Sequence, residues 1–128
     1  MLLETTRTIV IVLLAVAFVG MGSAHFLPQP SRGMVAMIPP RFRREGLLRP
    51  RNLVRFTGLC EVAGGLGLLV PQTRVAAGIA LIVFLIAVFP ANAFAARHPE
   101  KFGKAAIPFV PRLIAQVVLI AIIVFAIL

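Results

Sequence analysis

Five polar side chains interrupt the apolar stretches of the sequence, and their types give them the capacity for chemistry. They are His25, Glu61, Asn92, Arg112 and Gln116. Polar groups inside a hydrocarbon layer are costly, and proteins keep them there mostly to bind ligands, to carry protons or to join helices. The imidazole and the carboxyl group among them can exchange protons with a bound molecule.

Glu61 is the strongest candidate for a functional residue, because it lies farthest from the ends of its apolar block. It comes nine residues after Asn52, the start of that block, which places it roughly 13 Å deep at 1.5 Å per residue. Arg55 lies on another side of the same helix, so we expect His25 or Arg112 to pair with Glu61 from a different helix. Glu61 is then a proton-carrying or ligand-binding carboxylate, or a hydrogen-bonded strut between helices, and the sequence leaves both interpretations open.

The other four side chains also have two interpretations each. His25 is a proton acceptor or ligand contact, or it touches lipid headgroups at the end of its apolar block. Asn92 follows Pro90 by two residues, so it binds a ligand or satisfies backbone groups that the proline frees. Arg112 and Gln116 share a helix face; Arg112 holds an anionic headgroup or a loop acid, and Gln116 contacts a ligand or a neighbouring helix.

Composition places these residues in a membrane protein. Of the 128 residues 60% are hydrophobic and 13% are charged, against about half and about a quarter in soluble proteins. The mean hydropathy is +1.03. The formal net charge of +9 comes from residues between apolar blocks, and Trp and Tyr are absent, so a nucleic-acid-binding surface is excluded. The single cysteine, Cys60, excludes an intrachain disulfide, a dithiol redox centre and a cysteine-based zinc site, and no metal site is predicted.

Four apolar blocks are each close to the roughly 20 residues that cross a bilayer as a helix. They span residues 8–26, 52–70, 74–96 and 112–128, and the short fourth block needs an added turn at its start or a locally thinner bilayer. The tight turn at 71–73 makes the second and third helices antiparallel neighbours. The sequence therefore predicts an all-α fold, a transmembrane four-helix bundle in a single domain. The first block also has the features of a signal peptide, with Gly22-Ser23-Ala24 as cleavage site, which is the alternative.

Basic residues predict the orientation in the membrane. Two of the 13 Lys and Arg residues, Arg7 and Arg74, lie on the side of the two termini, and eleven lie on the other side. The positive-inside rule places the basic loops 27–51 and 97–111 in the cytoplasm and both termini outside. The run of Arg41, Arg43 and Arg44 is a candidate contact for a partner or an anionic lipid.

The depths of the polar residues point toward this basic side. Asn92 and Gln116 lie roughly 6 Å inside the basic ends of their blocks, and His25 and Arg112 lie near those ends. Together with Glu61, they would line one cavity that opens toward the cytoplasm if the polar faces turn inward.

Several short segments resemble the DoxX-like family of membrane proteins, in order and over nearly the whole chain. The segment from Gly22 to Phe26 resembles a GxxHF element, and Met37-Ile38-Pro39-Pro40 resembles a VPP element. The others are Thr57-Gly58 with Glu61, Gly64-Gly65-Leu66-Gly67-Leu68-Leu69, Pro71 with Thr73-Arg74, Phe89-Pro90-Ala91-Asn92, and Arg112-Leu113 with Gln116. Arg41-Phe42-Arg43-Arg44 departs from the family's usual pattern after the VPP element. The resemblance implies a four-helix protein of the bacterial inner membrane.

The activities of the family imply a redox connection. One member is a membrane subunit of a thiosulfate:quinone oxidoreductase, others are linked to a membrane complex for thiol and superoxide stress, and distant relatives are assembly chaperones. We therefore expect an accessory subunit of a redox or oxidative-stress system that binds quinone or a small apolar ligand near His25 and Glu61. The chemistry would come from a redox protein partner, because the chain has no haem, iron–sulfur or dithiol ligands and no predicted catalytic residue.

Two alternatives remain from the sequence. The first is a non-enzymatic membrane scaffold, chaperone or lipid-binding protein, which recruits its partner through the basic loops. The second is a small transporter, which would require a homo-oligomer because four helices without repeats do not form one alone.

Overall fold

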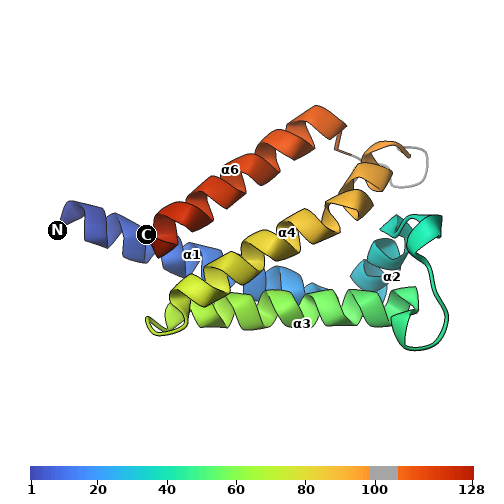
Figure 1. Cartoon of the computed structure of the whole chain (residues 1–128), viewed down its shortest axis with the longest axis horizontal. Coiled ribbons are helices and arrows are strands. Elements are labelled where there is room, and N and C mark those ends of the chain that lie inside the picture. The colour runs from blue at the N-terminus through green and yellow to red at the C-terminus, as the bar shows by residue number, and fades with distance from the viewer. Residues whose placement is uncertain (99–106) are drawn as a thin grey trace.

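The computed structural model describes residues 1–98 and 107–128. These residues form α-helices and two 3-10 turns, with no β-strand among them, and the predicted all-α fold is confirmed. Figure 1 shows how the helices are arranged. The α-helices are α1 (Leu2–Ala24), α2 (Pro28–Met37), α3 (Pro50–Leu69), α4 (Arg74–Ala96) and α6 (Phe109–Ile127), and the 3-10 turns are Pro40–Phe42 and Gly46–Leu48.

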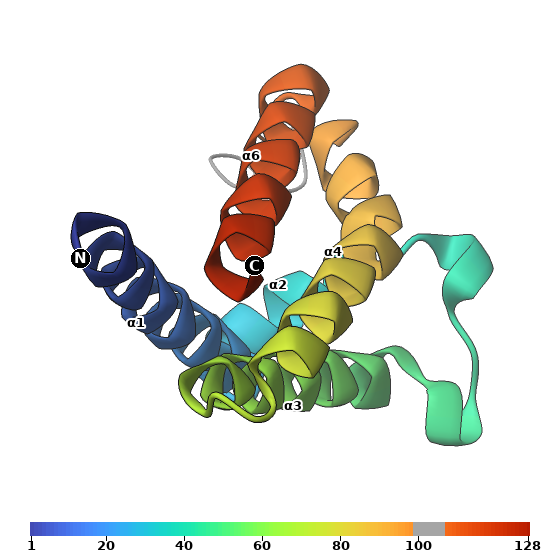
Figure 2. The ribbon, with the colours of Figure 1, turned by 60° about the vertical axis from the view of Figure 1, so that its left-hand side comes forward.

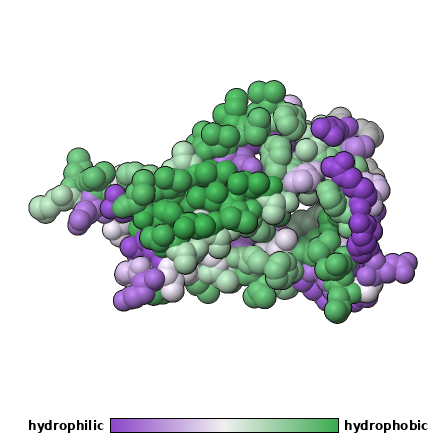
Figure 3. Space-filling model, in the orientation of Figure 1, coloured by the Kyte–Doolittle hydropathy of each residue, from purple (hydrophilic) through white to green (hydrophobic). Residues whose placement is uncertain are grey.

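Three of these helices are long and apolar enough to cross a membrane, by their length and composition. They are α1, α4 and α6. Large apolar side chains project outward from them, such as Ile79 and Val83 on α4 and Val117 on α6. In Figure 3 hydrophobic residues cover the middle of the visible face, and hydrophilic residues gather at its edges. An outward apolar surface of this kind is what lipid contact requires.

Helices α1 and α3 pack closely and antiparallel to one another. Gly22 of α1 faces Gly58 of α3, whereas Ala15, earlier in α1, faces Gly65, later in α3. A Cβ atom added to Gly58 would lie 2.5 Å from the His25 Cβ atom and 2.8 Å from the Gly22 carbonyl oxygen. The glycines therefore let the two backbones approach to a distance that any side chain would prevent.

Helix α4 lies antiparallel to α3, as the tight turn at 71–73 predicts. Leu81 of α4 faces Gly64 and Ala77 faces Gly67. The turn is fixed by hydrogen bonds that Thr73 and Arg74 donate to the carbonyl oxygens of Gly67 and Leu68. These bonds satisfy carbonyl groups that the end of α3 leaves free.

The core lies where α1, α3, α4 and α6 meet, and α1 contributes Ile11, Leu14 and Phe18 to it. Leu68, Leu81 and Ile123, from α3, α4 and α6, are the largest fully buried side chains. Near the C-terminus, the Arg7 guanidinium of α1 lies 5.6 Å from the centre of the Phe125 ring of α6. Figure 1 shows the two chain ends toward the same side of the molecule, and in Figure 2 α6 is seen between α1 and α4.

The helix limits differ from the predicted blocks mainly at the ends. Helix α4 has the predicted limits, 74–96, and α3 lies two residues and one residue from its predicted start and end, 52–70. Helix α1 starts at Leu2 rather than Thr8 because the polar first turn is also helical. Helix α6 starts at Phe109, which supplies the extra turn that the short block 112–128 required.

Helix α2 lies within the connection 27–51, where the sequence predicted no helix. Prolines normally break helices, but Pro28 occupies the first helical position, where its missing N–H costs nothing. The helix ends before Pro39, which favours the extended backbone found at Ile38. Most of the other predicted basic loop, 97–111, lies outside the described residues.

Candidate functional site

A buried ion pair between α1 and α3 is the centre of the site. The His25 Nε2 atom lies 2.8 Å from the Glu61 Oε2 atom, and the two side chains are only 11% and 9% exposed. Glu61 is the one charged residue that is buried among those described. Oε2 has no other hydrogen-bond partner in the described part of the chain, so the imidazole is what stabilises the buried carboxylate at this oxygen. His25, rather than Arg112, is therefore the partner of Glu61.

The other imidazole nitrogen fixes the orientation of His25. Nδ1 lies 2.9 Å from the Val54 carbonyl oxygen and 3.0 Å from the Thr57 hydroxyl oxygen. The Thr57 hydroxyl itself donates to the Val54 carbonyl oxygen at 2.9 Å. Both oxygens accept from Nδ1, so this pattern assigns a proton to Nδ1 and leaves Nε2 facing the carboxyl group. One further proton can then be shared between Nε2 and Oε2.

Local structure explains why the pair forms. His25 is the C-terminal cap of α1: its backbone N–H donates to the Gly22 carbonyl oxygen, and the backbone N–H of Phe26 donates to the Ser23 carbonyl oxygen. Thr57 and Glu61 are four residues apart in α3, which places them on one helix face, as the sequence predicts. The close approach of Gly22 and Gly58 brings the imidazole to that face.

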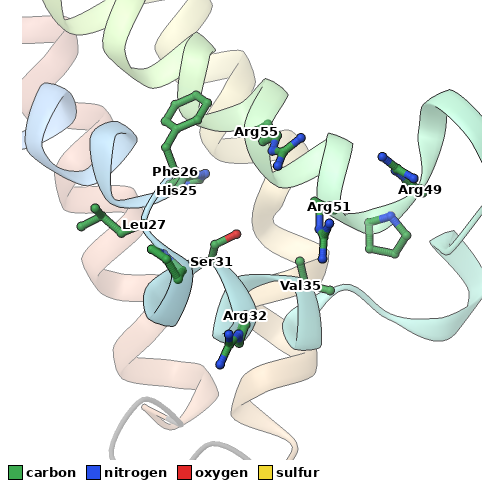
Figure 4. A pocket seen from close by; sticks show the side chains of 11 residues that line it. His25, Phe26, Leu27, Ser31, Arg32, Val35, Arg49, Arg51 and Arg55 are labelled. Atoms are coloured by element: carbon green, nitrogen blue, oxygen red, sulfur yellow. The ribbon is translucent and has the colours of Figure 1, made fainter.

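A groove of about 710 Å³ opens beside His25, between the first turns of α2 and α3. Figure 4 shows its side chains, with Ser31 and Val35 from α2 and Arg51 and Arg55 from α3. His25 lines this groove and also contacts Glu61, whereas Glu61 itself does not line it. The imidazole thus stands between the groove and the buried carboxyl group.

A second polar pair joins α4 to α6. The Arg112 Nη1 atom donates to the Asn92 Oδ1 atom at 3.2 Å, and the Arg112 Nε atom donates to the Ile107 carbonyl oxygen at 3.2 Å. Gln116 is half-buried one turn further along α6, and in the described part of the chain it has no hydrogen bond to either pair. Of the five predicted residues only His25 lines the groove, so the expectation that all five surround one cavity does not hold for this groove.

The arginines predicted to contact a partner hold their own segment together. Arg43 donates to the carbonyl oxygens of Ile38 and Ala36, and Arg44 donates to those of Arg41 and Arg43. The Arg41 guanidinium lies 4.9 Å from the centre of the Phe42 ring. Their role as partner contacts stays a prediction.

Removal of the Asn92 amide is expected to weaken the attachment of α6 to α4. Because Arg112 loses a charge-assisted hydrogen bond, Asn92→Leu should lower the free energy of unfolding by about 1 to 3 kcal/mol. In a double-mutant cycle with Arg112→Leu, the two effects should not add, and the coupling measures the bond. Gln116→Leu is the control and should have less effect, and additive losses from Asn92→Leu and Arg112→Leu would contradict the pairing.

These features define the class of the protein: an all-helical chain with three helices able to cross a membrane and a buried histidine–glutamate pair beside a groove. Residues 14–126 match a family described as a domain of unknown function, DUF8561, and the chain belongs to that family. The matched range includes His25, Glu61 and every residue of the groove. No curated protein and no solved structure matches the chain.

Proposed function

We propose that this chain is an integral membrane accessory protein that binds a quinone or another small apolar molecule beside the His25–Glu61 pair. The observation that carries the proposal is the buried carboxyl group, whose partner imidazole reaches a groove. The groove volume falls in the range of about 300 to 1,000 Å³ that is usual for small-molecule sites. Phe26, Leu27 and Val35 supply apolar surface in it.

The proposed architecture is a transmembrane four-helix bundle with α3 as the fourth span. Its 20 residues reach about 30 Å, which is the thickness of a hydrocarbon core. Arg51 and Arg55 lie in its first turns, at the basic end and outside the centre of the bilayer, and Glu61 is paired with His25, so α3 can cross without an unpaired charge near the midplane. Both termini would face outward from a bacterial inner membrane, and kinship with DoxX-like proteins is part of the proposal.

The proposed role of the pair is proton exchange. A quinone takes up protons when it is reduced, and the proton shared between Nε2 of His25 and Oε2 of Glu61 lies one side chain from the groove. Thr57 and the Val54 carbonyl oxygen hold the imidazole in position for this exchange. Electrons would be supplied by a redox protein partner, as the family resemblance implies.

Native mass spectrometry of the protein released from membranes in mild detergent tests this proposal. The wild-type protein should retain a quinone or another small apolar molecule, and Glu61→Gln should lose it. Glu45→Gln, which removes an exposed carboxyl group far along the chain from the pair, is the control and should retain it. Equal retention by Glu61→Gln would reduce Glu61 to a structural strut.

A non-enzymatic scaffold or chaperone is the second candidate. The adjacent Leu47 and Leu48 are both exposed in the basic segment between α2 and α3, and they are the surface proposed for a protein contact. Such a scaffold would keep its partner in Glu61→Gln but lose it when Arg41, Arg43 and Arg44 become Gln. A homo-oligomer would be detected in the same spectra as a multiple of the chain mass.

Cysteine labelling should establish the proposed orientation. In a Cys60→Ser background, intact cells treated with a membrane-impermeant maleimide should label Gln72→Cys, in the turn before α4, and should not label Arg44→Cys. Both variants should react once the membrane is permeabilised. The reverse pattern would place the basic segment outside and contradict the positive-inside orientation.

A further inference from the structure

We propose that the arginine-rich end of the groove binds the phosphate of an anionic phospholipid headgroup. Arg49, Arg51 and Arg55, from the start of α3, and Arg32, from α2, line this end. No acidic residue is among the lining residues. The lipid site does not depend on the proposed quinone site, which lies at the His25 end of the same groove.

These four guanidinium groups have unused donors. Among the described residues, none of the four makes a side-chain hydrogen bond or an ion pair, and all four are exposed. In contrast, Arg43 and Arg44 donate to nearby carbonyl oxygens. Like charges gathered without partners repel one another, and a bound anion relieves that repulsion. Planar guanidinium groups match phosphate oxygens particularly well.

The backbone adds to the positive potential of the groove. Helix α2 starts at Pro28 and helix α3 starts at Pro50, and both prolines line the groove. Neither helix has a side-chain cap at its N-terminus. The N-terminal end of a helix carries a partial positive charge that favours phosphate, and here two such ends supplement the arginines.

The apolar side of the groove favours a lipid over a soluble phosphate. Phe26 and Leu27 follow directly after α1, are about half exposed and line the groove beside His25. Figure 4 shows them at the α1 side of the groove, with Arg51 directed from α3 toward α2. An acyl chain can lie along the apolar surface of α1 while its headgroup reaches the arginines. A net negative headgroup is preferred, because a zwitterionic one brings its own cation near them.

Lipid retention in nanodiscs of mixed phosphatidylglycerol and phosphatidylcholine tests this proposal. The wild-type protein, released into the gas phase, should retain phosphatidylglycerol in preference to phosphatidylcholine. Arg51→Gln/Arg55→Gln should weaken phosphatidylglycerol binding roughly thirtyfold, since each basic side chain contributes about fivefold near an anionic surface. Arg51→Lys/Arg55→Lys keeps the charge and should retain most of the binding. If it does, the loss in the glutamine variant results from the missing charges and not from misfolding of the chain.

The control is Arg97→Gln, which removes one positive charge from the second groove, of about 350 Å³ between the Pro39–Pro40 segment and α4. It should leave lipid retention unchanged, whereas Arg55→Gln alone should weaken phosphatidylglycerol binding about fivefold. Equal losses in these two single variants would mean that net charge alone attracts the lipid, and would overturn the site. Displacement of the lipid by millimolar inorganic phosphate would overturn the lipid as the ligand. Glu61→Gln should still retain phosphatidylglycerol although it should lose the quinone. The two proposals can therefore fail independently of each other.

Discussion

Replacement of His25 by alanine is expected to lower the free energy of unfolding by about 3 to 5 kcal/mol, the usual cost of removing one partner from a buried ion pair. Oε2 of Glu61 is buried and has no hydrogen-bond partner besides His25 among the described residues, so the carboxylate would remain unpaired. Unfolding in mixed micelles at neutral pH measures the loss.

A double variant separates the ion pair from other roles of His25. His25→Ala/Glu61→Gln has no buried charge, so it should recover much of the stability that His25→Ala loses. The variant Thr57→Val removes a contact to Nδ1 but leaves the pair in place, and it should cost about 1 kcal/mol. If the His25 and Glu61 effects simply add, the two side chains are not coupled and the structural basis of the site is wrong.

Gly58→Ala is the second substitution with a large expected effect. The new Cβ atom would approach the His25 Cβ atom and the Gly22 carbonyl oxygen at distances that real Cβ atoms do not adopt. The obstacles are a backbone atom and the base of a side chain, neither of which can rotate away, so α1 and α3 must separate. We expect a loss of about 1 to 3 kcal/mol, as for overpacked cores, together with a longer His25–Glu61 distance.

Gly20→Ala is the matched control for this substitution. Gly20 also lies inside a helix, α1, but nothing lies within 4 Å of an added Cβ atom. It should leave stability unchanged or raise it by up to about 1 kcal/mol, because alanine favours helix. Thermal unfolding of both variants measures the difference, and equal behaviour would contradict the close approach of α1 and α3.

The sequence predicts the long helices well because their signal is local. Apolar blocks between charged segments give the limits of α4 without error, and the tight turn before it gives its antiparallel packing on α3. The sequence does not predict helix α2, because its prolines Pro28 and Pro30 disfavour a helix everywhere except in the first turn, which is where both of them lie.

The partners within the site required the packing of helices and could only partly be predicted. The depth of Glu61 predicts a partner from another helix, and His25 and Arg112 both satisfy that condition. The choice between them depends on which helices touch: α3 packs against the end of α1 through Gly58, while Arg112 reaches Asn92 on α4. The Val54 carbonyl oxygen orients the imidazole. A sequence cannot predict this contact, because every residue has a backbone carbonyl group.

The arginines also show the limit of composition. Arg41, Arg43 and Arg44 stand out in the sequence as a run, but two of them are hydrogen-bonded within their own segment. Of the arginines that gather in the groove, Arg49, Arg51 and Arg55 are close in sequence at the start of α3, and the packing of α2 against α3 adds Arg32. The feature they share in the sequence is that each lies near the N-terminus of a helix that begins with a proline.

Infrared difference spectroscopy is the most direct test of the central claim that His25 and Glu61 exchange a proton with a molecule in the groove. The chain has only four acidic side chains, so the carboxyl band of Glu61 can be assigned by substitution. Reduction of a short-chain quinone in the same membrane should change one carboxyl band. The change should be absent in Glu61→Gln, altered in His25→Gln and retained in Glu45→Gln. A spectrum without any carboxyl change, or with a change that persists in Glu61→Gln, would contradict proton exchange at this pair.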